Sequence, residues 1–188
     1  MKRSFKLTAF MISFLLLLSI LIGGVIYRAT TANSPFDEAN QTNIDVDRNA
    51  QVIVDISIVI NAPLQTVWRL QTGIDQWPTW QKDITQAQLS GPIAAGSSFN
   101  WETHGLPVIS TIREVDPMRR IVWGGPALGI DGVHVWTFTT TPNGVVVHTT
   151  ESWDGPPVAA DPDGMRAALT SSLTAWLAAL KTTAEAAH

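Results

Sequence analysis

Most of the chain after residue 50 alternates between apolar and polar positions, which is the pattern of half-buried β-strands. The segment 51–60, QVIVDISIVI, is the clearest case and is rich in Val and Ile. Shorter runs of the same kind follow at 84–89, 97–103, 107–115, 120–123, 133–140 and 145–153. Gly, Pro, Asp and Asn separate several of these runs. Consecutive strands joined by short turns predict one antiparallel sheet of about seven strands.

A short segment after the first strand has helical spacing instead. Leu64, Val67 and Trp68 lie on one face of a helix that would begin after Pro63, and proline suits the first turn of a helix. The run DQWPTWQK that follows contains Pro78 and predicts a second short helix or a turn.

The end of the chain predicts a longer helix. Asp161 can cap its N-terminus, and Pro162 stands where the first helical residue belongs. A single apolar stripe then runs along a helix of about 20 residues. The stripe consists of Met165, Leu169, Leu173, Trp176, Leu177 and Leu180. Because such a stripe must be buried, we expect this helix to pack on one face of the sheet.

The first 33 residues are of a different kind. Residues 7–27 carry no charge, and as a helix they would be about 31 Å long, close to the thickness of a bilayer core. Lys2, Arg3 and Lys6 precede them, so the rest of the chain would be exported. The length favours an uncleaved signal anchor within 1–33. A cleaved signal peptide is the alternative.

This N-terminal segment sets the expected domain organisation. We expect a linker at 34–50, which is polar and without a sustained period, and one folded domain at 51–188. With the anchor uncleaved, the domain would be membrane-anchored through residues 7–27 on the periplasmic or extracellular side. With the signal cleaved, it would be secreted.

Composition excludes several classes of function. The chain has no Cys, which excludes disulfides, Cys-ligated zinc, iron–sulfur clusters and a thiol nucleophile. The net charge is −4, made of +4 on residues 1–33 and −8 on the rest, and it argues against a nucleic-acid partner. Nucleotide-binding and nucleophile-elbow motifs are absent, and the four His are too dispersed for a local zinc motif. We therefore expect no cofactor and no metal.

Several short segments, in this order, carry a resemblance to a known family. They are Ile60-Asn61-Ala62-Pro63 before Val67-Trp68, IDQWPTWQKDI at 74–84, Val115-Asp116-Pro117, Trp136-Thr137-Phe138, and Glu151-Ser152-Trp153-Asp154-Gly155. Together they resemble the START-like (SRPBCC) superfamily, most closely its polyketide cyclase/dehydrase-type branch. The resemblance covers about residues 51–187. It implies an α+β helix-grip fold, in which a curved antiparallel sheet surrounds a long C-terminal helix.

The same resemblance implies a cavity between sheet and helix for lipids, sterols, polyketides or other apolar molecules. Members range from ligand carriers to cyclases and share no catalytic motif, so it implies no catalytic residue here. The eight Trp of this chain agree with an aromatic cavity, although each could also simply fill the core. We expect the ligand-binding residues to be Trp80, Trp101, Trp123, Trp136, Phe138, Glu151, Trp153, Leu169, Leu173 and Trp176.

Glu151 is the weak candidate for chemistry. Alternation places it on the same face as Trp153, and if that face is the inner one, its carboxyl points toward the cavity mouth. A partly buried carboxyl could act as an acid or base, or hold a polar group of a ligand. The alternative is structural pairing with one arginine: Arg113, Arg119 or Arg120. His104 and His134 could each be a polar residue of the cavity, but we expect both of them, and the turn at Arg119-Arg120, to face solvent.

Three functions follow from these observations. The first is binding of a small hydrophobic or amphipathic ligand, which could serve transport or sensing. If the anchor is uncleaved, the bilayer could be the source of this ligand. The second is a polyketide cyclase/dehydratase-like enzyme in which Glu151 and a histidine transfer protons. The third is an interaction domain without a cavity, whose tryptophans all belong to the core.

Overall fold

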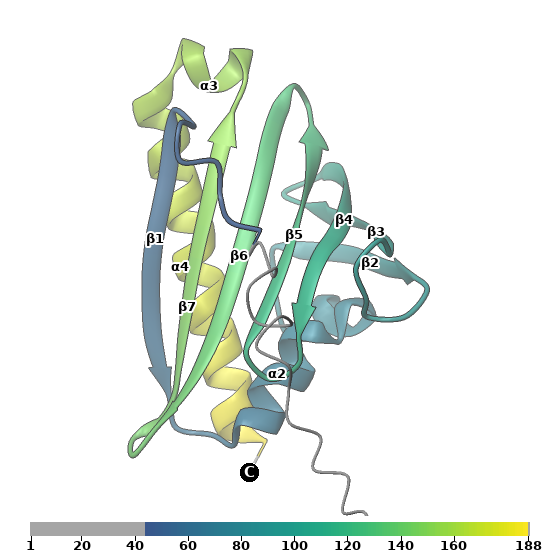
Figure 1. Ribbon diagram of the computed structural model, residues 1–188, viewed down its shortest axis with the longest axis vertical. Coiled ribbons are helices and arrows are strands. Elements are labelled where there is room, and N and C mark those ends of the chain that lie inside the picture. The colour runs from purple at the N-terminus through teal and green to yellow at the C-terminus, as the bar shows by residue number, and fades with distance from the viewer. Residues whose placement is uncertain (1–43, 188) are drawn as a thin grey trace, which may run out of the picture. The chain divides into compact units, whose positions relative to one another are not determined.

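The computed structural model describes residues 44–187 (Figure 1), which form a curved antiparallel sheet around a long helix. The elements, in order, are β1 (Val52–Ile60), α2 (Leu64–Thr72), the 3-10 helix η1 (Ile74–Thr79), β2 (Ile84–Ser90), β3 (Ser98–Thr103), β4 (Leu106–Asp116), β5 (Arg120–Ala127), β6 (Ile130–Thr141), β7 (Gly144–Asp154), α3 (Pro156–Ala160) and α4 (Pro162–Ala186). The expected helix-grip architecture of the domain is confirmed.

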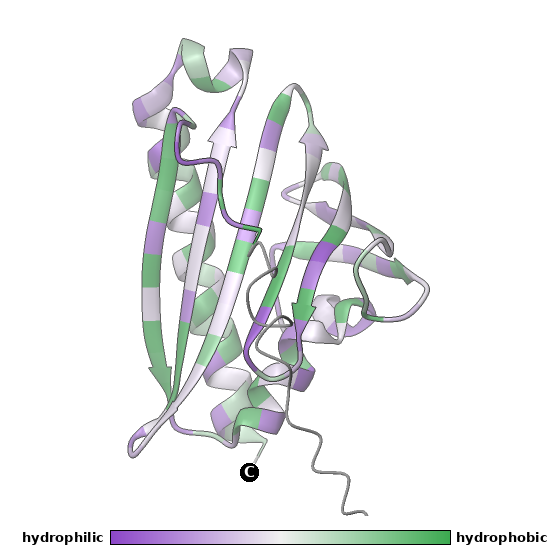
Figure 2. Cartoon of the chain, in the orientation of Figure 1, coloured by the Kyte–Doolittle hydropathy of each residue, from purple (hydrophilic) through white to green (hydrophobic). Residues whose placement is uncertain are grey.

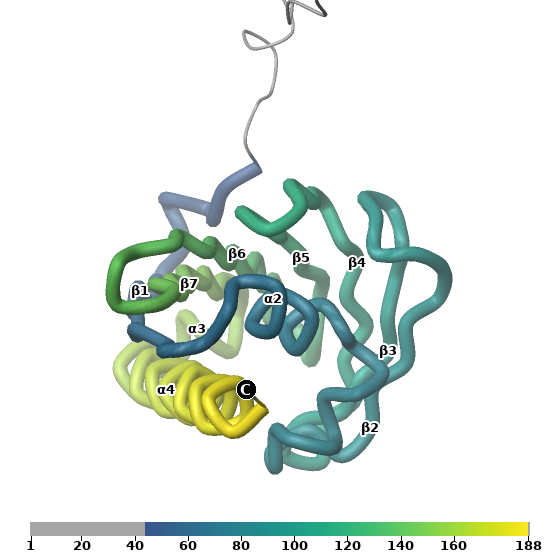
Figure 3. The backbone as a smooth tube through the Cα atoms, turned by 90° about the horizontal axis from the view of Figure 1, so that it is seen from below, coloured from purple at the N-terminus to yellow at the C-terminus, as the bar shows by residue number. Residues whose placement is uncertain are grey.

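The seven strands lie in the order β1-β7-β6-β5-β4-β3-β2. Strands β2 to β6 each pair with the next strand along the chain. Strand β1 pairs with β7, from Val52 opposite Trp153 to Ile60 opposite Val145. Viewed along the strands, the sheet curls into an arc with α4 and α2 on its inner side (Figure 3). Apolar and polar positions alternate along the strands (Figure 2), so that each strand buries one face.

Strand β5 is longer than the sequence predicts. Gly124-Gly125-Pro126 was expected to end the strand, but these residues pair with β6 as far as Ala127 opposite Ile130. A Cβ on Gly124 would collide with the carbonyl oxygen of Gly132. The glycines therefore permit close pairing of the strands. Gly125, two residues from Trp123 and on the same inner face, leaves space where another residue would project a side chain.

Helix α4 begins as expected and ends later. The carboxylate of Asp161 accepts a hydrogen bond from the backbone N–H of Gly164 at 3.0 Å, which caps the helix. The helix has 25 residues rather than about 20. Five members of the predicted stripe are buried, and the sixth, Met165, is half-buried.

Residues 44–50, expected to be linker, lie against the sheet. Val46 is 4% exposed and packs with Val122 of β5 and Val135 of β6. These two side chains lie on the face of the sheet opposite the main core. The described part of the folded unit therefore begins before residue 51.

Arg120 belongs to the same region and does not face solvent as expected. Its side chain is 17% exposed, forms an ion pair with Glu114 at 3.1 Å and donates to the carbonyl oxygen of Ile44. Arg119 is exposed, as expected. The segment 44–50 covers Arg120. This packing could not be predicted, because the sequence of the segment is polar and has no regular period.

The expected signal segment 1–33, with its apolar residues 7–27, lies outside the described residues. Between residues 44 and 187, none of the helices combines the length and the apolar character needed to cross a membrane.

Candidate ligand-binding cavity

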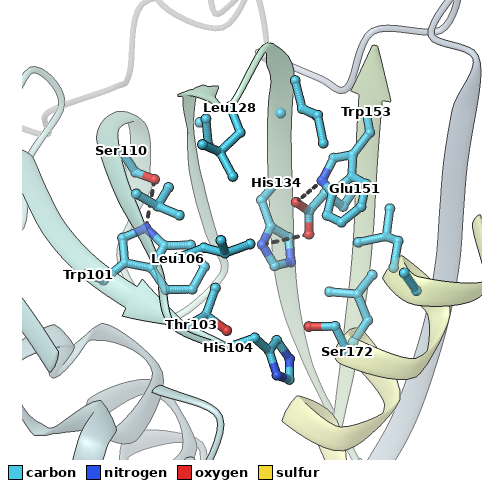
Figure 4. Close-up of a pocket in the computed structure, with 18 of the residues that line it drawn as sticks. Trp101, Thr103, His104, Leu106, Ser110, Leu128, His134, Glu151, Trp153 and Ser172 are labelled. Atoms are coloured by element: carbon cyan, nitrogen blue, oxygen red, sulfur yellow. Dashed lines mark hydrogen bonds and ion pairs between the residues drawn. The ribbon is translucent and has the colours of Figure 1, made fainter. Parts of the chain in front are cut away.

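A cavity of about 760 Å³ lies between the N-terminal half of α4 and strands β3 to β7 (Figure 4). This volume falls within the roughly 300–1,000 Å³ of small-molecule sites. The helix contributes a row of side chains at helical spacing, and the sheet contributes aromatic and glycine positions. The principal lining residues are Trp101, Trp123, Gly124, Gly125, His134, Glu151, Trp153, Met165, Leu169, Ser172, Leu173 and Trp176. The expectation of a domain without a cavity is wrong.

Indole rings form one end of this cavity. Trp101 of β3 and Trp176 of α4 have ring centroids 5.8 Å apart, and Trp123 of β5 lies 6.5 Å from Trp176. Trp77 of η1 is fully buried behind them, with its ring 5.0 Å from that of Trp176. The close ring contacts fix the wall in place, because each indole is held by the others.

Trp77 was not among the expected site residues, although it holds the others in position. Its indole N–H donates to the backbone oxygen of Gln71 at 3.0 Å, which ties η1 to α2. The sequence did show a short helix or turn around Pro78, but no period indicated which of its two tryptophans points inward. Trp77 does, and Trp80 is only half-buried.

Most indole N–H groups of the wall bond to the protein. Trp101 donates to the hydroxyl of Ser110 at 3.1 Å, and Trp176 donates to the side-chain oxygen of Gln71 at 3.2 Å. Trp153 donates to the carboxyl of Glu151 at 2.7 Å. These three indoles therefore present apolar ring surface to the cavity.

The polar part of the wall is a pair of side chains from neighbouring strands. His134 of β6 and Glu151 of β7 are directly opposite in the register, and His134 Nδ1 lies 3.2 Å from Glu151 Oε2. Figure 4 shows Glu151 between Trp153 and His134, with an interaction to each. His134 Nε2 lies 2.8 Å from the hydroxyl of Thr149 on β7.

Burial favours the uncharged form of both side chains. Loss of solvation raises the pKa of Glu151 to about 7, an effect that the hydrogen bond from Trp153 partly offsets. Loss of solvation also lowers the pKa of His134 to about 3. A carboxylic acid beside a neutral imidazole can hydrogen-bond a polar group of a ligand or exchange a proton with it.

Two hairpin turns border the mouth of the cavity and carry exposed apolar side chains. Leu106 follows the β3–β4 turn and is 46% exposed, and Leu128 in the β5–β6 turn is 65% exposed. Leu128 has a φ of 53°, which is unfavourable for a branched side chain. An apolar rim of this kind suits the passage of an apolar molecule.

Seven of the ten expected ligand-binding residues line this cavity: Trp101, Trp123, Glu151, Trp153, Leu169, Leu173 and Trp176. The other three, Trp80, Trp136 and Phe138, do not line it. Trp136 and Phe138 lie farther along β6, where the space is filled, and Phe138 packs edge-to-face on Trp68 of α2 at 5.3 Å. Trp80 packs against the main core.

The histidines and Glu151 also differ from expectation. His134 is 4% exposed rather than at the surface, because its strand faces inward at that position. His104 is exposed, as expected, and lies at the edge of the cavity. Glu151 bonds to Trp153 and lies beside His134 instead of pairing with an arginine. Across residues 44–187, no three His, Asp or Glu side chains gather as metal ligands.

Comparison with known proteins places these features in a family. Residues 51–185 match the family described as polyketide cyclase / dehydrase and lipid transport. No curated protein sequence matches the chain.

Solved structures share the fold at low identity. Hypothetical protein jhp0584 from Helicobacter pylori is 20% identical with a TM-score of 0.63, over 78% of this chain and 99% of that one. A START superfamily protein from Mycobacterium smegmatis is 11% identical with a TM-score of 0.63, over 72% and 99%. The di-domain ARO/CYC protein StfQ of the steffimycin biosynthetic pathway is 17% identical with a TM-score of 0.59, over 72% of this chain and 51% of that one. This chain thus corresponds to about half of the di-domain protein.

Proposed function

The chain belongs to the polyketide cyclase/dehydrase and lipid transport family, and from this premise we propose that it binds a small, largely apolar molecule in the cavity between the sheet and α4. The resemblance to the START-like (SRPBCC) superfamily and its cyclase-type branch is confirmed. The family includes both catalysis and lipid transport, so the choice between them has to come from the site.

One observation carries the proposal: the cavity has a mainly aromatic and aliphatic wall, in which Glu151 and His134 form a buried pair of polar side chains. Apolar surface supplies binding free energy that depends on buried area, and a few polar groups orient the ligand. The exposed Leu106 and Leu128 at the mouth offer an apolar route into the cavity.

A substitution that fills the cavity tests this function. Ser172 of α4 lines the cavity, and Ser172→Phe would place a ring inside it. Thr174→Phe, on the exposed side of the same helix, is the matched control. Native mass spectrometry of the full chain should show a co-purified small molecule in the wild type and in Thr174→Phe, and none in Ser172→Phe. Equal occupancy in all three proteins would contradict the proposal.

A second candidate is a cyclase/dehydratase-like enzyme acting on a polyketide-like substrate. The observation that favours it is the contact of 3.2 Å between Glu151 and His134 in a desolvated wall. A general acid or base works best with a pKa near the operating pH, and burial raises the pKa of Glu151 to about 7. Glu151→Gln separates the two functions. A carrier keeps its bound molecule in this variant, whereas an enzyme loses turnover of a polyketide-like substrate while it still binds it.

The place where the domain works is a separate part of the proposal. We retain export across a membrane, with residues 7–27 as an anchor or a cleaved signal, because they are uncharged and follow three basic residues. An anchored domain could take its ligand from the bilayer. Carbonate extraction of membranes, with protease accessibility of the domain in intact cells, distinguishes anchored, secreted and cytoplasmic forms.

A further inference from the structure

The charges on the cavity wall restrict what can be bound there. The titratable side chains that line the cavity are Asp83, His104, His134 and Glu151, and none of the described lining residues is Lys or Arg. Arg166, on the first turns of α4, donates instead to the backbone oxygens of Ile53 and Gln51. Among the described lining residues, an anionic group inside this cavity would therefore find no Lys or Arg side chain to pair with.

The hydrogen bonds around His134 favour one position for its proton, because the carbonyl oxygen of Val135 can only accept, whereas His134 Nε2 can donate or accept. The hydroxyl of Thr149 donates its one hydrogen to the backbone oxygen of Val135 at 3.2 Å. The same hydroxyl can then only accept from His134 Nε2, 2.8 Å away, so Nε2 carries the proton of the ring. In a neutral imidazole, Nδ1 is then an acceptor.

This tautomer determines the state of the neighbouring carboxyl. Nδ1 of His134 needs a donor, and Glu151 Oε2 at 3.2 Å can donate only if the acid is protonated. The other oxygen, Oε1, already accepts from the indole N–H of Trp153 and has one lone pair left. Toward the cavity, Glu151 is therefore an uncharged hydrogen-bond acceptor.

We propose that the cavity selects uncharged ligands that carry a hydroxyl group, an alcohol or a phenol, which donates to Glu151 Oε1, and that it rejects carboxylates, sulfonates and phosphates. The proposal rests on the proposed function and adds the chemical class of the ligand. Burial of an anion without a partner is strongly unfavourable, and a buried acceptor is best satisfied by one donor. Free fatty acids are excluded by the same argument.

Three naphthalene probes of similar size test this selection on the full chain at pH 6. The reporter is N-phenyl-1-naphthylamine, which fluoresces in apolar sites and so reports occupancy of the cavity. The three probes that compete with it are 2-naphthol, naphthalene and 2-naphthoate. We expect 2-naphthol to displace it at the lowest concentration, naphthalene to require several-fold more, and 2-naphthoate about tenfold more than 2-naphthol. A 2-naphthoate affinity equal to or above that of 2-naphthol would overturn the proposal.

The same assay separates failure of this inference from failure of the proposed function. If N-phenyl-1-naphthylamine does not bind, or binds equally well to Ser172→Phe, no ligand enters the cavity and both proposals fall. If it binds in the cavity but the three probes compete equally, the selection alone is wrong.

Two further measurements test the role of Glu151 directly. In Glu151→Leu, 2-naphthol should lose its affinity advantage over naphthalene, while naphthalene still competes with the reporter. If 2-naphthol kept that advantage in the variant, the proposal would be overturned. Glu151→Leu could fold poorly, so a second measurement uses the wild type. The ¹⁵N signals of the His134 ring at pH 6 report which of its nitrogens is protonated. We expect a protonated Nε2 and an unprotonated Nδ1, whereas an imidazolium signal would contradict the inferred hydrogen bonds.

Discussion

The space between α4 and the sheet has two halves that are built from the same kinds of residue. Around the C-terminal half of α4 it is solid, with Leu177 and Leu180 at most 3% exposed and Phe138 packed against Trp68. Around the N-terminal half it is hollow, with Leu169, Leu173 and Trp176 on the wall of a cavity of about 760 Å³. We call these the packed half and the hollow half.

The glycines of β5 leave space in the sheet, but the larger difference between the two halves comes from a third layer. Helix α2 lies inside the arc of the sheet and fills the packed half (Figure 3), where it contacts α4, β6 and β7. In the hollow half none of the helices between residues 44 and 187 takes that place, and α3, with five residues, lies at the end of the sheet (Figure 1). A cavity therefore forms where α4 and the sheet face each other without an inserted element.

The largest expected effect is a difference between two leucines of α4. Leu180→Ala removes a fully buried side chain from the packed half and should lower the free energy of unfolding by about 4 kcal/mol. Leu173→Ala, at the edge of the hollow half, should lower it by about 2 kcal/mol, because its side chain lacks neighbours on the cavity side. Urea unfolding of both variants measures the difference, and equal losses would contradict the distinction between the halves.

The next effect is on the pH dependence of stability. Between the usual pKa values of 4.5 for Glu and 6.5 for His, the folded pair holds one proton on Glu151, and the unfolded pair holds one on His134. In the wild type, the contribution of this pair to the free energy of unfolding is therefore nearly independent of pH between 4.5 and 6.5. In Glu151→Gln only His134 titrates, and the unfolded state binds one proton more than the folded state.

The free energy of unfolding of Glu151→Gln should therefore fall by about 2 to 3 kcal/mol relative to wild type as the pH falls from 6.5 to 4.5. Above pH 7, the raised pKa of Glu151 no longer contributes, because the acid is then ionised in both states. Denaturant unfolding at pH 4.5, 5.5, 6.5 and 7.5 gives the two profiles. Parallel profiles would mean that the buried carboxyl is not protonated.

The smallest effect concerns the mouth of the hollow half. Leu128 has a φ of 53° in a two-residue turn before Gly129, a position that favours Asn. Leu128→Asn should raise the free energy of unfolding by about 0.5 to 1 kcal/mol and weaken capture of apolar probes. Leu106→Asn, which adds the same side chain at the other turn without a positive φ, is the control. A gain in stability of equal size in both variants would contradict the argument from backbone strain.

The sequence predicted which residues of a strand share a face, but neither which face is the inner one nor how deeply each residue is buried. His134 and Trp136 are two residues apart on the same inner face of β6, yet His134 lines the cavity and Trp136 lies outside it in the core. Alternation gives a residue its face, whereas α2 decides which positions along that face are filled. The partner of Glu151 depended on the register of β6 against β7, which periodicity does not reveal.

The indole N–H signals of the eight tryptophans offer the most direct measurement of the central claim, that the hollow half is a binding site. Addition of N-phenyl-1-naphthylamine to the ¹⁵N-labelled full chain should move the signals of Trp101, Trp153 and Trp176, which line the cavity, and leave those of Trp68 and Trp80 in place. Shifts centred on Trp68 and Trp80, or no shift at all with saturating probe, would contradict the account.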